Sequence, residues 1–298
     1  MKTKAESGYI IESVILAVII LLTLPLRTVQ YYSVIEPGSG FYTKMSATVI
    51  LFYILIAAAC LFFVCSSFAK RKKYTLDSSA KKRPVYGFFC ALCGIAAGIS
   101  AYREYSLKDV DTSKYTVSST VMQSASSGLL ALQMSFAVLS AVFFILLAIS
   151  CFMGRNLSDY KLFSLAPVLW NVFRLVVRFT RTISYIRVSD LLLEMLMISA
   201  FCLFLMAFAQ SNSQINAKGS EWKIPALGFT AALLGLICFV PRAILTVTGH
   251  ADMMYALSRA DIADLALALF AIATVTTRMV AVSGSVITAG EPESETAE

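Results

Sequence analysis

Residues 162–188 read LFSLAPVLWNVFRLVVRFTRTISYIRV, and the position of this stretch decides what kind of molecule the chain forms. At helical spacing a mostly polar line of side chains runs along one side, while nearly everything else as far as Phe179 is apolar. The line holds Ser164, Pro167, Asn171, Arg174, Arg178, Arg181 and Tyr185. Arginine is costly in lipid unless it faces protein, water or headgroups, so this helix must lie against one of them.

The composition indicates a membrane protein. Of 298 residues, 58% are hydrophobic and 14% are charged, whereas a soluble domain carries about 25% charged residues. The apolar residues form continuous blocks near the ~20 residues that cross a bilayer as a helix, and not the ~10-residue alternation of barrel strands. The predicted fold is an all-α, polytopic transmembrane helix bundle. Residues 1–289 are its single domain, and residues 290–298, with four Glu, are predicted to be a disordered acidic tail.

Eight helices are expected, and the number that cross the membrane depends on the arginine-bearing one. Their expected ranges are 9–27, 45–68, 85–102, 128–152, 162–181, 190–210, 224–247 and 261–287. The excess of Lys and Arg on the cytoplasmic side is larger with seven spans than with eight. This favours seven spans, with the arginine helix lying on the membrane surface. Its narrow polar line favours eight, because an interfacial helix needs a broad charged face. We predict eight spans, with seven plus one interfacial helix as the alternative.

A run of basic residues separates the second and third expected helices. It comprises Lys70, Arg71, Lys72, Lys73, Lys81, Lys82 and Arg83. Such runs stay on the cytoplasmic side of a membrane. We therefore expect a protein of the cell membrane whose N-terminus is cytoplasmic and, with eight spans, whose C-terminus is cytoplasmic as well. The same run is a candidate site for anionic lipid headgroups, although setting the topology is a sufficient role for it.

The arginine helix is also the source of a candidate ligand site. If residues 182–189 form a tight hairpin, Arg181 and Glu194 fall at similar depth and are expected to pair, with Glu12, Asp261 and Asp264 as other counter-charges. The predicted pocket lies between the helices at 162–181 and 261–287. Its candidate residues are Asn171, Arg174, Arg178, Arg181, Glu194 and Asp264. Guanidinium groups suit an anionic substrate and membrane carboxylates suit proton or cation coupling, but structural ion pairs are the alternative for all of them.

Other chemistries find little support in the sequence. The seven cysteines lie in or beside apolar runs without a disulfide framework, and Cys90 and Cys93 are most simply packing residues. The single histidine, His250, has no ligand cluster or nucleophile motif around it, and no phosphate-binding glycine loop is present. We therefore expect no catalytic residues, no metal and no cofactor. The net charge of +7 is explained by topology and headgroups, so no nucleic-acid partner is expected.

These observations leave two main functional hypotheses. The first is a small-molecule or ion permease with the polar pocket described above. The second is a non-catalytic membrane scaffold or signalling subunit that binds a protein partner or lipid, with its polar residues serving bundle packing. A membrane-embedded enzyme is a distant third. A membrane-protein partner or a second copy of the chain is compatible with either main hypothesis.

Two segments of the sequence resemble known membrane proteins. SLAPVLWNVFRLVVRF at residues 164–179 and SDLLLEMLMISAF at residues 189–201 resemble segments of uncharacterised bacterial multi-pass membrane proteins. The resemblance covers two of the expected helices. It implies the same membrane class and no particular activity.

Overall fold

The computed structural model describes residues 7–36, 42–72, 74–76, 81–106, 127–155, 162–181, 188–213, 221–250 and 260–281. Eight α-helices and one pair of short strands make up this part of the chain. The elements are α1 (Ser7–Ser33), α2 (Ala47–Ala69), β1 (Tyr74–Leu76), α3 (Pro84–Ser106), α4 (Ser127–Met153), the short 3₁₀ turn η2 (Leu162–Leu165), α5 (Ala166–Arg181), α6 (Val188–Asn212), α8 (Lys223–Val247), α9 (Ile262–Arg278) and β2 (Met279–Ala281).

The predicted membrane helix bundle is confirmed. Within the described ranges, seven helical segments are long and apolar enough to cross a membrane, and one of them, Leu162–Thr180, holds η2 and most of α5. The remaining helix, α9, has 17 residues and ends at Arg278. The helix predicted over 261–287 is therefore too long, because residues 279–281 pair as a strand.

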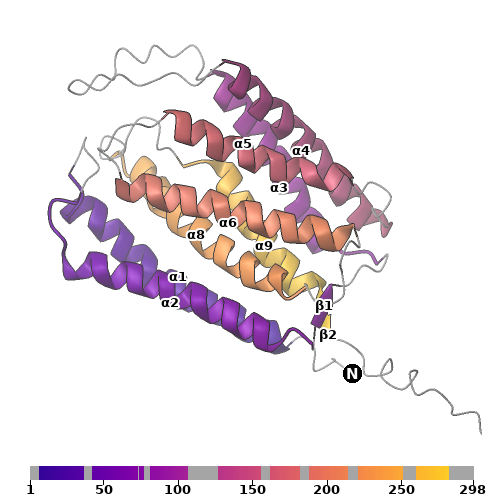
Figure 1. Cartoon of the computed structure of the whole chain (residues 1–298), viewed down its shortest axis with the longest axis horizontal. Coiled ribbons are helices and arrows are strands. Elements are labelled where there is room, and N and C mark those ends of the chain that lie inside the picture. The colour runs from indigo at the N-terminus through magenta and orange to yellow at the C-terminus, as the bar shows by residue number, and fades with distance from the viewer. Residues whose placement is uncertain are drawn as a thin grey trace, which may run out of the picture.

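The helices pack around an aromatic centre at Phe270 of α9, which is completely buried. Its ring centroid lies 5.8 Å from Tyr86 of α3, 5.2 Å from Phe144 of α4 and 5.4 Å from Phe208 of α6. The pair α1 and α2 lies at the side of the bundle (Figure 1) and contacts α8, for example through Phe63 and Phe229. The short helix α9 is thus enclosed by longer ones.

The arginine-bearing helix α5 lies within the bundle. Phe173 stacks on Phe136 of α4 with ring centroids 5.1 Å apart, and Val177 packs against Leu130 of the same helix. On its other side α5 contacts α6 (Figure 1). The structure therefore does not show the alternative in which this helix lies apart on a membrane surface.

The two ends of the bundle differ in character. Strand β1 follows α2, strand β2 follows α9, and the two pair antiparallel at one end, which we call the basic end (Figure 1). The start of α1 is at the same end, since Tyr9 contacts Tyr74 of β1 with centroids 4.7 Å apart. At the opposite end, which we call the network end, α9 begins with Asp261 as its N-cap. Helix α9 therefore connects the two ends.

Candidate functional site

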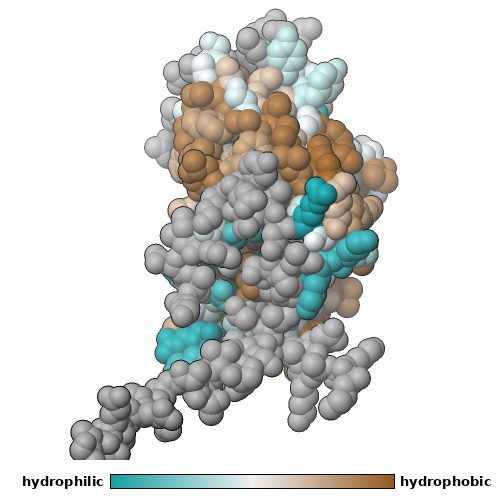
Figure 2. Space-filling view, turned by 90° about the vertical axis from the view of Figure 1, so that its right-hand side faces the viewer, coloured by the Kyte–Doolittle hydropathy of each residue, from teal (hydrophilic) through white to brown (hydrophobic). Residues whose placement is uncertain are grey.

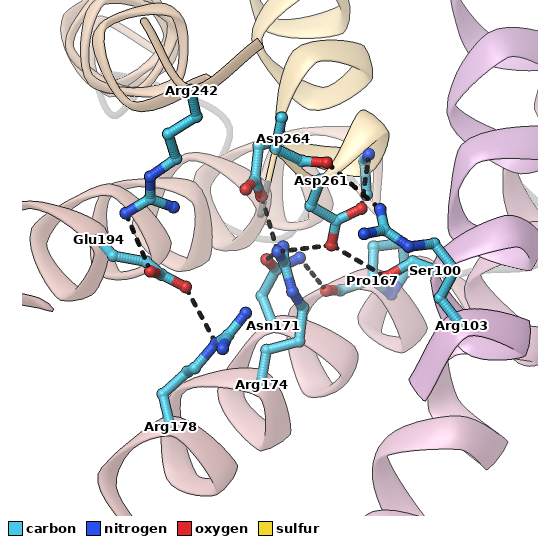
Figure 3. A network of polar contacts seen from close by, with 12 residues as sticks. Ser100, Arg103, Pro167, Asn171, Arg174, Arg178, Glu194, Arg242, Asp261 and Asp264 are labelled. Carbon is cyan, nitrogen blue, oxygen red and sulfur yellow. Dashed lines mark hydrogen bonds and ion pairs between the residues drawn. The ribbon is translucent and has the colours of Figure 1, made fainter. Parts of the chain in front are cut away.

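The polar line of α5 meets carboxylates of α9 near the network end (Figure 3). Arg174 donates to Asp264 at 2.6 Å and to Asp261 at 3.3 Å. It also donates to Asn171, one turn earlier on α5, at 3.3 Å. Asn171 is held in turn by a hydrogen bond to the carbonyl of Pro167. One guanidinium group thus binds two carboxylates, which ties α5 to α9.

A second cluster joins α5 to α6 and α8 (Figure 3). Glu194 of α6 accepts from Arg178 of α5 through Oε1 at 2.9 Å. Its Oε2 accepts from Arg242 of α8 at 3.2 Å. One carboxylate thus binds two guanidinium groups, the reverse of the arrangement at Arg174.

Asp261 connects the network to α3. Its Oδ1 accepts from the amide of Ala263 and caps α9, as expected for an aspartate before the first helical turn. Its Oδ2 accepts from Ser100 of α3 at 3.1 Å, in addition to Arg174. Arg103, one turn further along α3, donates to the carbonyl of Ala260 at 3.2 Å. The network therefore links α3, α5, α6, α8 and α9.

Most of the network is inaccessible to solvent. Arg174, Glu194, Asp264 and Arg242 expose 5% of their surface or less. The side chains of Arg178 and Asp261 are 20% and 16% exposed. Removing one partner from a buried ion pair leaves an uncompensated charge and costs about 3–5 kcal/mol. The pairs consequently hold their helices together unless another charged group takes a partner's place.

A buried amide of α4 lies at the same depth in the bundle as the network. The contacts of Phe136 with Phe173 and of Leu130 with Val177 show the antiparallel register of α4 and α5, which puts Gln133 level with Arg174. Gln133 is 4% exposed, and its Oε1 atom has no hydrogen-bond partner among the described residues. A buried amide oxygen is costly to leave unpaired, so this position favours a donor from outside the described protein atoms.

The structure brings together most of the predicted ligand-binding residues. Asn171, Arg174, Arg178, Glu194 and Asp264 all belong to the network. The side chain of Arg181 lies outside the described residues, and so does its predicted pair with Glu194.

The sequence analysis did not identify three residues of the network, which are Ser100, Arg103 and Arg242. The available signal was an arginine inside the apolar run of α8, which requires a buried counter-charge.

The basic run at the opposite end is only partly engaged. Lys70 pairs with the buried Glu12 of α1. Arg71 lies over the ring of Phe68, while Lys72, Lys81 and Lys82 are exposed. The side chain of Lys73 is outside the described residues.

The described part of the chain contains no group of three or more His, Cys, Asp or Glu side chains that could hold a metal ion. All seven cysteines are free thiols. The guanidinium, carboxylate and amide groups of the network can form ion pairs and hydrogen bonds with a ligand.

Comparison with protein-family models, with curated proteins and with solved structures finds no match to this chain. The resemblance of residues 164–179 and 189–201 to bacterial multi-pass membrane proteins stays a prediction.

Proposed function

We propose that this membrane protein is a small-molecule or ion permease whose gate is the polar network at the ends of α5, α6, α8 and α9. The observation that carries the proposal is the burial of Arg174, Glu194 and Asp264 at one place between otherwise apolar helices. Charged side chains inside a membrane bundle are expensive, and they commonly mark a path for ions or polar solutes.

Two members of the network offer access to a ligand. Arg178 and Asp261 are the partly exposed members of its ion pairs, and they have opposite signs. Asp261 also makes the longer of the two ion pairs with Arg174, 3.3 Å against 2.6 Å for Asp264. An anion approaching this end meets Arg178, and a cation meets Asp261. Deeper in the bundle, Gln133 supplies a free acceptor level with Arg174.

The ion pairs suggest how the gate opens. Helix α5 is tied to α6 through Arg178 and Glu194 and to α9 through Arg174 and Asp264. Separation of α5 from either neighbour leaves buried charges unpaired, which is strongly unfavourable. A charged ligand that replaces one partner removes this cost, so ligand entry and movement of α5 are linked.

The proposal is tested by ligand-dependent stabilisation. Thermal unfolding of the purified protein in detergent is followed with sodium acetate, sodium phosphate, glycine and choline chloride at matched ionic strength. These probes represent a carboxylate, a phosphate, a zwitterion and a cation. We expect at least one of them to raise the unfolding temperature, because a ligand that binds the folded state stabilises it.

Variants decide where the active probe binds. Arg178→Gln is expected to abolish stabilisation by an anionic probe, and Asp261→Asn is expected to abolish stabilisation by choline. Lys44→Gln, at an exposed position outside the network, is expected to retain either effect. Uptake of the active probe into proteoliposomes then separates a permease from a protein that only binds.

The alternative is a scaffold or signalling subunit in which the ion pairs only hold the bundle together. It predicts that none of the four probes stabilises the protein and that Arg178→Gln merely lowers its stability. This combination of results would contradict the permease.

A further inference from the structure

We propose that the basic end carries a binding surface for anionic phospholipid headgroups, independent of any permease activity. The surface, which we call the basic patch, consists of Arg71, Lys72, Lys81, Lys82 and Arg83. All five residues lie in the connection between α2, which ends at Ala69, and α3, which begins at Pro84.

The basic patch is accessible at this end of the bundle. Four of its side chains are exposed, and Arg83 is half-buried. Glu12 and Glu221 are the acidic residues of this end within the described ranges, and both are occupied elsewhere. Glu12 pairs with Lys70, and Glu221 accepts from the amide of Leu76. Figure 2, which looks at the right-hand side of Figure 1, shows hydrophilic side chains grouped below a hydrophobic area.

The height of the patch along the bundle matches a headgroup layer. Its members are within three residues of the end of α2 or the start of α3, two helices long and apolar enough to cross a membrane. Basic residues immediately beside such helices attract anionic lipids through the negative surface potential of the membrane. The aromatic rings of Phe68 and Trp222 contact each other at the same end, with centroids 5.2 Å apart, as is typical of the membrane interface.

In the described part of the connection, backbone hydrogen bonds fix strand β1 and Arg83 before any lipid binds. Strand β1, in the middle of the connection, pairs with β2 at the end of α9. The amide of Leu76 donates to Glu221 at 2.9 Å, and the amide of Arg83 donates to the carbonyl of Cys151 at the end of α4. Pre-organisation lowers the entropy lost on binding, so the patch is better suited to a lipid than a flexible basic loop.

The acidic tail of the chain is a competitor for the patch. Residues 290–298 carry four Glu and follow β2, which is paired with β1 beside the patch. Tethering gives such a segment a high effective concentration. We assign the patch to lipid because its residues adjoin two membrane helices, and the experiment includes the tail as the other occupant.

The experiment compares full-length protein in phosphatidylcholine nanodiscs with protein in nanodiscs of phosphatidylcholine and phosphatidylglycerol in equal parts. We expect phosphatidylglycerol to raise the unfolding temperature by roughly 2–4 °C at low salt. The shift is expected to fall at high salt, because screening weakens exposed charges. The variant R71Q/K72Q/K81Q/K82Q is expected to lose most of the shift.

Matched single variants test the location. Lys82→Gln is expected to reduce the shift. Lys44→Gln, which changes another exposed lysine beyond the other end of α2, is expected to leave it unchanged. Because these side chains are exposed, all variants are expected to unfold within about 2 °C of the wild type in pure phosphatidylcholine. This baseline separates lost lipid binding from a folding defect.

The opposite results overturn the proposal. They are the absence of a shift specific to phosphatidylglycerol, or a full shift in the fourfold variant. A shift that appears only after residues 290–298 are deleted shows that the tail occupies the patch, which also overturns the assignment to lipid. A shift of the same size or larger in the deletion variant than in the full chain supports it.

Discussion

Arg174 of α5 donates to Asp264 of α9 at 2.6 Å, although the two residues are 90 positions apart in the chain. The contact is buried and joins the arginine-bearing helix to the helix at the centre of the bundle. Its neighbour Asp261 binds the same guanidinium group less closely. The two aspartates therefore contribute unequally to one site, and this inequality can be measured.

Asp264→Asn is expected to destabilise the protein more than Asp261→Asn. The first change removes the closer, buried carboxylate from Arg174, at a cost of up to about 3–5 kcal/mol. The second removes a partly exposed and longer ion pair, and the asparagine oxygen still caps α9. Thermal unfolding in one detergent gives the order directly. Equal losses for the two variants would contradict the unequal roles of the carboxylates.

Glu194→Gln is expected to cost more than Arg178→Gln, because it leaves both Arg178 and Arg242 without their shared carboxylate. The double variant R178Q/E194Q is expected to be more stable than the sum of the single losses predicts, by about 1–3 kcal/mol. Unfolding of the four proteins of this cycle measures the coupling. Strictly additive losses would mean that the 2.9 Å contact contributes nothing to stability.

Gly94→Ala and Gly98→Ala form a matched pair on α3. A Cβ atom at Gly94 would lie 2.8 Å from Cγ1 of Ile145 and 3.0 Å from the carbonyl of Ala141 on α4, so we expect a loss of about 1–3 kcal/mol. A Cβ atom at Gly98 meets nothing within 4 Å, and alanine favours the helix there by up to about 1 kcal/mol. Melting temperatures should therefore move in opposite directions, and a fall of both would contradict the close packing of α3 on α4.

Phe270→Ala is expected to destabilise the bundle by about 3–5 kcal/mol, because a completely buried ring that contacts three other helices is lost. Phe270→Leu keeps most of the volume and should cost much less. The exposed Phe88 of α3 provides a control, since Phe88→Ala removes a ring from the outer surface. An effect of Phe88→Ala as large as that of Phe270→Ala would contradict the central position of α9.

The strand pair makes a prediction about topology. Because β1 and β2 are paired, the segment after α9 and the connection between α2 and α3 must be on the same side of the membrane. A reporter fused after Glu298 and a thiol reagent directed at Lys72→Cys, in a protein without its native cysteines, should report the same side. The basic run predicts that this side is the cytoplasm. Opposite sides for the two probes would contradict the pairing.

Much of the fold could be predicted from the sequence, because the requirement for long apolar helices is local. Continuous apolar blocks predicted the helices, and the spacing of Asn171, Arg174 and Arg178 predicted one polar line on α5. The same reasoning extended the last helix to residue 287, because an apolar run does not reveal that residues 279–281 find a strand partner in residues 74–76. Pairing of distant backbone segments leaves no local periodicity.

The sequence by itself determined that this chain forms a membrane helix bundle and that α5 needs buried counter-charges. Both conclusions depend on composition and spacing alone, because these set the helical periodicity and the cost of charge in lipid. Only the tertiary structure decided which charges meet. It gave Glu194 both Arg178 and Arg242, and it gave Arg174 both Asp261 and Asp264. Such pairings depend on the depth and rotation of each helix against its neighbours, which side-chain packing sets across the whole bundle.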